Sequence, residues 1–114
     1  MNKPEHNECA ASMLAVRDAI DVISGKWKLM ILISISAGNK RFREIERSVP
    51  KITSKVLAKE LKDLEEHYLI KRTVYDALPV SVEYTTTPYS KSLQPVIEAL
   101  RDWGVKHRKK IIGK

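Results

Sequence analysis

Two short helical patterns joined by a tight turn, between residues 41 and 67, constrain this chain more than any other stretch. In the first pattern, apolar residues recur three or four positions apart, at Phe42, Ile45 and Val49. In the second, they recur at the same spacings, at Leu57, Leu61 and Leu64. The turn is Pro50-Lys51-Ile52, and Thr53 follows it where a helix N-cap is expected. Because helices this short cannot bury an apolar stripe alone, they are expected to pack on each other and on the remaining chain.

The faces that these stripes leave outside are basic, with Arg41, Arg43, Arg47, Lys51, Lys55, Lys59 and Lys62. Residues 26–62 hold ten basic and three acidic side chains, so their net charge of +7 equals that of the whole chain. This concentration of positive charge favours a polyanionic partner. Helix, turn and helix with a basic exposed face is typical of a helix-turn-helix that reads DNA. On these residues alone, a helical hairpin with a solvated charged surface is an equal alternative.

Two further helices are expected before this unit. The first covers about residues 8–24, with Asn7 as its cap and Gly25 at its C-terminal end. It is slightly acidic, and its apolar stripe suits a partner subunit. The second, over residues 26–37, is apolar around nearly its whole axis and is therefore expected to be a core helix buried on nearly all sides. A strand is the competing interpretation, and Lys26 and Lys28 at its start are expected to reach a phosphate.

The period changes after residue 69. Residues 70–75 and 80–87 are rich in β-branched and aromatic residues, and the second segment alternates with a period of two. Residues 76–79 form the connecting turn. Three helices followed by an antiparallel hairpin predict the winged form of the helix-turn-helix, whose wing reaches the DNA backbone or minor groove.

A last helix is expected over about residues 88–110, with Thr87 as its cap and Pro88 at its first position. Its apolar side carries Leu93, Val96, Ile97, Leu100 and Trp103. Pro95 falls within the pattern and is expected to kink or restart the helix. The basic tail over residues 106–110 is a DNA contact or a solvated terminus, and the second interpretation is favoured.

Residues from about 14 to 104 match one family pattern in order and without a large gap. The matching residues are Gly25, Lys26, Trp27, Arg41, Phe42, Glu44, Ile45, Leu57, Leu61, Leu64, Glu65, Glu66, Leu69, Ile70, Arg72, Tyr75, Pro79, Val82, Glu83, Tyr84, Thr87, Leu93, Pro95, Val96, Leu100, Trp103 and Gly104. In them the chain resembles the HxlR-type winged helix-turn-helix transcriptional regulators of bacteria, relatives of the MarR group.

The resemblance implies a mainly α fold with a small β-hairpin, in a single winged helix-turn-helix domain over residues 1–114. Its core would span about residues 26–87, and the helices over 8–24 and 88–110 would form a homodimer. It also implies a regulator, favoured as a repressor, that binds an inverted repeat in double-stranded DNA. Trp103 would then be a core or interface anchor. Family members often respond to small molecules, or to oxidants through a Cys-Pro pair, so an effector of either kind is open.

Three departures from the family pattern matter. The Cys-Pro pair of the family falls on Leu14-Ala15 here, whereas the single cysteine, Cys9, lies five residues earlier. Cys9 is therefore interpreted as a bystander thiol, with a redox role as the alternative. The usual basic wing position is Ser81, and Lys51 replaces the usual glycine in the turn, which must tolerate a Cβ atom.

The predicted DNA-binding residues on the second helix of the unit are Thr53, Ser54, Lys55, Ala58, Lys59 and Lys62. Lys55 and Lys59 are expected to donate to guanine O6 or N7, and Ala58 to touch a thymine methyl group. Arg41, Arg43, Lys51 and Lys62 are predicted to contact phosphates, with Arg72 a weaker wing candidate.

Other functions are less well supported. The chain has only four glycines and no glycine-rich phosphate loop, and its three histidines are scattered, so no catalytic residue, cofactor or metal site is predicted. A winged-helix module that binds a protein or RNA without operator specificity is the alternative function. The single cysteine, the lack of a long apolar run and the absence of a signal-peptide pattern predict a cytoplasmic protein with no membrane partner.

Overall fold

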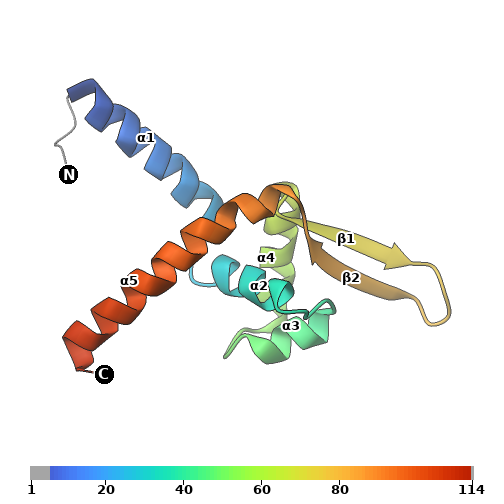
Figure 1. Cartoon of the computed structure of the whole chain (residues 1–114). Coiled ribbons are helices and arrows are strands. Elements are labelled where there is room, and N and C mark those ends of the chain that lie inside the picture. Colours follow the sequence, from blue (N-terminus) through green and yellow to red (C-terminus); the bar gives the residue numbers. More distant parts are fainter. Residues whose placement is uncertain (1–5, 114) are drawn as a thin grey trace.

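The computed structural model describes residues 6–113 of the chain (Figure 1). The elements in order are α1 (His6–Ile23), α2 (Lys28–Ser36), α3 (Phe42–Ser48), α4 (Ser54–Glu66), β1 (Ile70–Tyr75), β2 (Ser81–Thr86), the 3-10 helix η1 (Tyr89–Leu93) and α5 (Gln94–Ile112). The predicted mainly α fold with a small β-hairpin is confirmed.

The hydrophobic core lies where α2, α3, α4 and the start of β1 meet. Its fully buried side chains come from each of these helices and from the residues just after α4: Ile31, Ile45, Leu57, Leu61, Leu64 and Leu69. Trp27, Phe42 and Tyr84 pack against this cluster from outside. The two apolar stripes of the helix-turn-helix unit therefore meet each other and α2, as their spacing predicted.

The prediction that α2 is buried on nearly all sides is wrong. Ile31, Leu32 and Ile35 are buried, but the side chain of Ile33 on the opposite face is 50% exposed. The reason is that α5 stands away from this face and leaves a groove of about 370 Å³, lined in part by Leu29 and Ile33. The sequence pattern correctly predicted that α2 is apolar on nearly all sides. The rest of the chain, however, buries only part of the apolar surface of α2.

The helix ends follow the expected signals with one exception. Gly25 and Gly38 have φ angles of +94° and +112°, in the region that favours glycine, and they follow α1 and α2. Among the described residues, α1 extends back to His6, so Asn7 lies within the helix and not at its cap. No helix in the described part of the chain combines the length and apolar character that a bilayer crossing requires.

The wing is a two-stranded antiparallel hairpin in which Ile70 pairs with Thr86 and Tyr75 with Ser81. Its strands lie within a residue of the predicted segments. The backbone N–H of Tyr84 donates to the carbonyl oxygen of Lys40 over 2.7 Å, which joins β2 to the loop between α2 and α3. This bond fixes the base of the wing against the helix-turn-helix unit.

The first and last helices extend from the core as two arms (Figure 1). The radius of gyration is 17.1 Å, whereas a compact domain of about 100 residues has about 13 Å. In the last arm, Thr87 Oγ1 accepts a hydrogen bond from the N–H of Ser90, and Pro95 marks the place where η1 gives way to α5. The predicted restart at Pro95 is confirmed.

Candidate DNA-binding surface

The N-terminal end of α3 is fixed by a carboxylate. The side chain of Glu44 accepts hydrogen bonds from the backbone N–H groups of Lys40 and Arg41, both over 3.0 Å. These bonds satisfy donors that a helix start leaves free, and they stabilise the ionised carboxylate. The hydrogen bonds from Arg41 and Lys40 therefore hold the pKa of Glu44 below its ordinary value.

The turn between α3 and α4 is held by apolar residues on both sides of an exposed lysine. Val49 and Ile52 are buried in the core, whereas Lys51 is exposed. Lys51 has a φ angle of +67°, in the left-handed region where a residue with a Cβ atom is uncommon. The turn therefore accepts a side chain where the resembling family uses glycine, and it presents that side chain to solvent.

The helix α4 is fixed at its start and along its inner face. Thr53 Oγ1 accepts a hydrogen bond from the N–H of Val56 over 3.2 Å, which confirms the predicted N-cap. Leu57, Leu61 and Leu64 are at most 2% exposed, which confirms the predicted inward stripe. The orientation of α4 is therefore set by the core, and its opposite face is turned outward.

The structure places every residue of the predicted DNA-binding set at the surface. On α4 and its cap, the exposed residues include all of the predicted set, namely Thr53, Ser54, Lys55, Ala58, Lys59 and Lys62. Arg41, Arg43 and Lys51 are exposed on the preceding helix start and turn. Arg72 is also exposed, but it lies on β1 opposite Tyr84, outside the helix-turn-helix unit.

The predicted set of this surface does not include Glu46, which lies beside the start of α4. The hydroxyl of Ser54, the first residue of α4, donates a hydrogen bond to the carboxylate of Glu46 on α3. An acidic group therefore lies beside the first turn of the helix that is expected to meet DNA. The sequence offered no signal for this contact, because the eight-residue separation crosses the turn.

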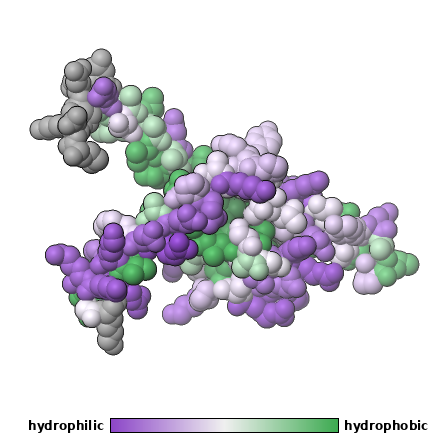
Figure 2. Space-filling model, in the orientation of Figure 1, coloured by the Kyte–Doolittle hydropathy of each residue, from purple (hydrophilic) through white to green (hydrophobic). Residues whose placement is uncertain are grey.

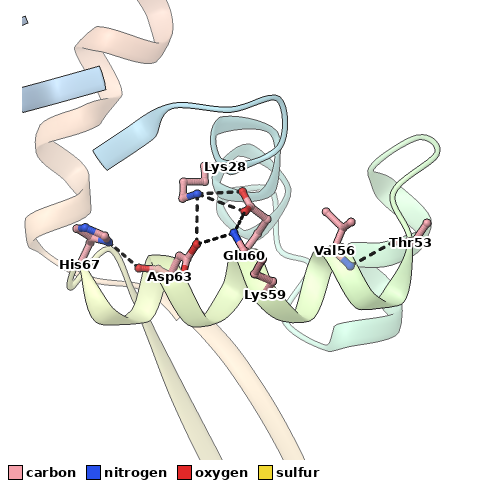
Figure 3. Close-up of polar contacts among 7 residues, drawn as sticks. All are labelled: Lys28, Thr53, Val56, Lys59, Glu60, Asp63 and His67. Carbon is pink, nitrogen blue, oxygen red and sulfur yellow. Dashed lines mark hydrogen bonds and ion pairs between the residues drawn. The ribbon is translucent and has the colours of Figure 1, made fainter. Parts of the chain in front are cut away.

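A cluster of four charged side chains joins α2 to α4, and we call it the Lys28 cluster (Figure 3). Lys28 Nζ lies 3.1 Å from Glu60 Oε2 and 3.6 Å from Asp63 Oδ2. Lys59 Nζ approaches the same carboxylates from outside, 3.3 Å from Asp63 Oδ2 and 3.6 Å from Glu60 Oε1. The side chains of Lys28 and Glu60 are only 11% and 9% exposed. The prediction that Lys28 reaches a phosphate is therefore wrong, since its ammonium group is turned into the protein.

The ionisation of the outer pair follows from these contacts. The hydrogen bond to Asp63, together with the charges of Asp63 and Glu60, raises the pKa of Lys59. Burial alone would raise the pKa of Asp63, but the hydrogen bond from Lys59 and the charges of Lys59 and Lys28 hold that pKa below its ordinary value. Both groups therefore remain charged near neutral pH.

Charge is distributed unevenly along α4. The helix carries three lysines and four carboxylates, with Lys55 in its first turn and Glu65 and Glu66 in its last. Cations near a helix N-terminus and anions near its C-terminus both oppose the helix dipole. This order of charges does not favour the helix itself, but it places positive charge at the end of α4 that adjoins the turn.

Apolar surface is concentrated away from this unit. Figure 2 shows hydrophobic side chains along the α1 arm and at the end of the wing, whereas the surface over α3 is hydrophilic. On α1, Met13, Val16 and Ile20 are each more than half exposed, and Cys9 is an exposed free thiol. On α5, Trp103 is 64% exposed and stacks on His107 with ring centroids 4.8 Å apart.

Comparison with known proteins gives a consistent result over most of the chain. A family model described as HxlR-like helix-turn-helix matches residues 22–111. An uncharacterized HTH-type transcriptional regulator of Bacillus subtilis strain 168, YdeP, is 41% identical over 96 residues, which cover 84% of this chain and 75% of that protein. A second one from the same organism, YtcD, is 36% identical over 113 residues, which cover 99% of this chain and 85% of that protein.

Solved structures agree with this match. The redox regulator HypR in its reduced form superposes with a TM-score of 0.80 and 34% sequence identity. The superposition covers 88% of this chain and 99% of that chain. The order of helices and wing in this chain is therefore shared with a solved regulator over nearly its whole length.

Proposed function

The chain belongs to the HxlR-like helix-turn-helix family of transcriptional regulators, and from this membership we propose that it is a homodimeric repressor that binds an inverted-repeat operator in double-stranded DNA. The observation that carries the proposal is the construction of α4. Its inner face is held by three buried leucines, and the outer face of its first turns carries Ser54, Lys55 and Ala58, which are exposed and small or basic. Such a helix suits the major groove, since base recognition needs a rigid support and a face free of bulky apolar groups.

The proposed contacts divide into those that read bases and those that bind phosphates. Thr53, Ser54, Lys55 and Ala58 lie in the first turns of α4, where a recognition helix meets base edges. Lys55 is proposed to donate to guanine O6 or N7, and Ala58 to touch a thymine methyl group. The proposed phosphate contacts are Arg41, Arg43, Lys51, Lys62 and, on the wing, Arg72, all of which are exposed.

The proposed homodimer is supported by the arms. Several apolar residues on α1 and α5 are 40% exposed or more, among them Val16, Ile20, Leu100 and Trp103. An unpartnered apolar face on each arm is expected if a second copy covers it. Two copies would then present their α4 helices about 34–36 Å apart, the distance between successive major grooves on one side of DNA.

We also propose that an effector controls DNA binding. A small molecule would have room in the groove between α2 and α5, whose volume is about 370 Å³. HypR is a redox regulator, and this chain holds one exposed thiol, Cys9. Measuring operator binding by the wild type and by Cys9→Ser, before and after treatment with diamide, tests the redox possibility. Loss of binding only in the wild type would assign a redox role to Cys9, and equal binding by both proteins would remove it.

The test of the proposed function is selection of bound fragments from genomic DNA, followed by titration of the selected operator at several salt concentrations. If each subunit neutralises about four phosphates, the slope of log K against log salt is expected near −7 for the dimer. The selected sites should contain an inverted repeat, and random duplex should bind more weakly. A slope shallower than about −2, or equal affinity for operator and random DNA, contradicts the proposal. Binding to RNA without binding to duplex DNA would favour the alternative function, a winged-helix module that binds RNA or a protein.

A further inference from the structure

The three lysines of α4 stand in different surroundings, although the sequence presents them alike. Among the described residues, no ion pair involves Lys55 or Lys62, whereas Lys59 pairs with both Asp63 and Glu60. We infer that Glu60 and Asp63 withhold Lys59 from DNA phosphates and so lower the sequence-independent affinity of α4 for DNA. This inference rests on the proposed function, because it concerns how α4 divides its charges on DNA.

The carboxylates of this cluster are held in place from inside the protein. Lys28 reaches them from α2, at 3.1 Å from Glu60 and 3.6 Å from Asp63. The side chain of Lys28 is only 11% exposed, so water competes little for its contacts with the two carboxylates. Figure 3 shows Lys28 on one side of the two carboxylates and Lys59 on the other. The anionic pair is therefore a fixed part of the fold, and Lys59 occupies its outer side.

The four charges of the cluster cancel, so Lys59 presents little net charge to a phosphate. If Lys59 moved to DNA, it would exchange a carboxylate partner for a phosphate partner and leave Asp63, 31% exposed, with weaker compensation. The two carboxylates would also repel the approaching phosphate. Lys59 is therefore expected to release few counterions when DNA binds, unlike a lysine whose ammonium group is free.

The consequence concerns the affinity for the DNA backbone. Phosphate contacts act on every sequence alike, and they supply essentially all of the non-specific affinity. A lysine neutralised inside the protein lowers that background without removing the base contacts of the first turns. The Lys28 cluster thus lowers the sequence-independent part of the affinity, and base contacts supply a larger share of what remains.

The experiment compares glutamine variants of the three lysines in the full-length protein, with salt titrations on the selected operator and on a random duplex. Lys55→Gln, which removes a proposed base contact, should lower the affinity for the operator more than the affinity for the random duplex. Lys62→Gln, which removes a proposed phosphate contact, should flatten the slope of log K against log salt by about 0.9 per subunit, close to 2 for the dimer. Lys59→Gln should change it by less than half as much. Equal flattening by Lys59→Gln and Lys62→Gln would overturn the inference.

The reverse change is the sharper test. Asp63→Asn removes the more exposed carboxylate while Lys28 keeps Glu60 as its partner. Lys59 is then freer, so random duplex should bind at least about fivefold more tightly at low salt, with a steeper slope. Lys59→Gln in the Asp63→Asn background should cancel the gain, since the freed lysine is its source. An Asp63→Asn protein that is folded and has an unchanged slope would contradict the inference.

The two proposals fail in distinguishable ways. A wild-type slope shallower than about −2 removes the proposed function and the inference together. A steep wild-type slope with equal effects of Lys59→Gln and Lys62→Gln removes only the inference. Circular dichroism and the urea midpoint of each variant show whether a change in binding comes from a change in folding.

Discussion

The helices α4 and α5 carry apolar residues at the same spacing, yet they use them differently. Leu57, Leu61 and Leu64 of α4 are 0–2% exposed, whereas Leu100 and Trp103 of α5 are 49% and 64% exposed. The stripe of α4 is covered by α2, α3 and the start of β1, and the described part of the chain provides no such cover for α5. An amphipathic pattern thus identifies a helix and its apolar face, but it does not identify the molecule that covers that face.

The two helices also differ in how the charges at their ends interact with the helix dipole. Lys109 and Lys110 lie in the last turn of α5, where they favour the helix dipole, whereas α4 begins with Lys55 and ends with Glu65 and Glu66. A helix anchored by buried leucines tolerates this unfavourable order, because burial contributes more than the dipole interactions cost. The helix with the buried stripe, α4, is therefore also the helix whose outer face carries the proposed DNA contacts.

The largest effect is expected from truncating the buried stripe. Leu61→Ala should lower the free energy of unfolding by about 2–5 kcal/mol, because it leaves a cavity among fully buried side chains. Leu100→Ala, the matched change on α5, should cost less than about 1 kcal/mol at dilutions where the chain is monomeric. Urea denaturation at low protein concentration measures both. Equal losses would show that α5 is covered within one chain.

The next effect should appear only in assembly. Trp103→Ala should weaken the proposed homodimer by about 2 kcal/mol, a rise of about 30-fold in Kd, because large aromatic side chains dominate interfaces. Sedimentation equilibrium measures this change. Lys109→Ala, on another side of α5, is the control and should leave Kd nearly unchanged. A Trp103→Ala protein with the wild-type Kd would place the interface elsewhere.

A smaller effect is expected at the junction of α2 and α4. Lys28→Met should lower the free energy of unfolding by about 1–2 kcal/mol, because Glu60 then keeps only Lys59 as a cationic neighbour. The paired change Lys28→Met with Glu60→Met should recover part of the loss, since no buried charge then lacks its partner. Thermal unfolding of the single and double variants tests this. An additive double variant would show that the two residues do not interact.

The smallest effect depends on pH. Because the folded-state pKa of Glu44 is lowered, its contribution to stability is present above the ordinary glutamate pKa of about 4.3. That contribution is lost as the pH falls through the lower folded value. Glu44→Gln should therefore make the free energy of unfolding less dependent on pH below about 4.3, and Glu98→Gln on α5 is the matched control. The prediction fails if the two variants show the same pH profile.

Local patterns predicted the helix-turn-helix well. The cap at Thr53, the leucine stripe of α4, the wing strands and the restart at Pro95 each depend on residues close together in sequence. Their physical causes, namely capping, periodic burial and the missing N–H of proline, act within a few residues.

Contacts between distant residues were not predictable in this way. Lys28 and Glu60 are 32 positions apart, and either would be an ordinary surface charge on an isolated helix. The exposure of the Ile33 side chain on α2 depends on the direction in which α5 leaves the core. The contact between Ser54 and Glu46 depends on the angle between α3 and α4. The DNA contacts themselves remain predictions, because they require the partner as well as the fold.

The hydrogen bond from Tyr84 to Lys40 also has a mechanical consequence for the wing. The hairpin is held at Tyr84 and, among the residues that the structure describes, has no such bond at its turn. A given bend of the hairpin therefore displaces residues farther from Tyr84 by a larger distance. Arg72 pairs with Tyr84, whereas residues 76–79 form the turn. The proposed phosphate contact of Arg72 therefore lies beside the fixed point of the hairpin, whereas residues 76–79 lie farthest from it.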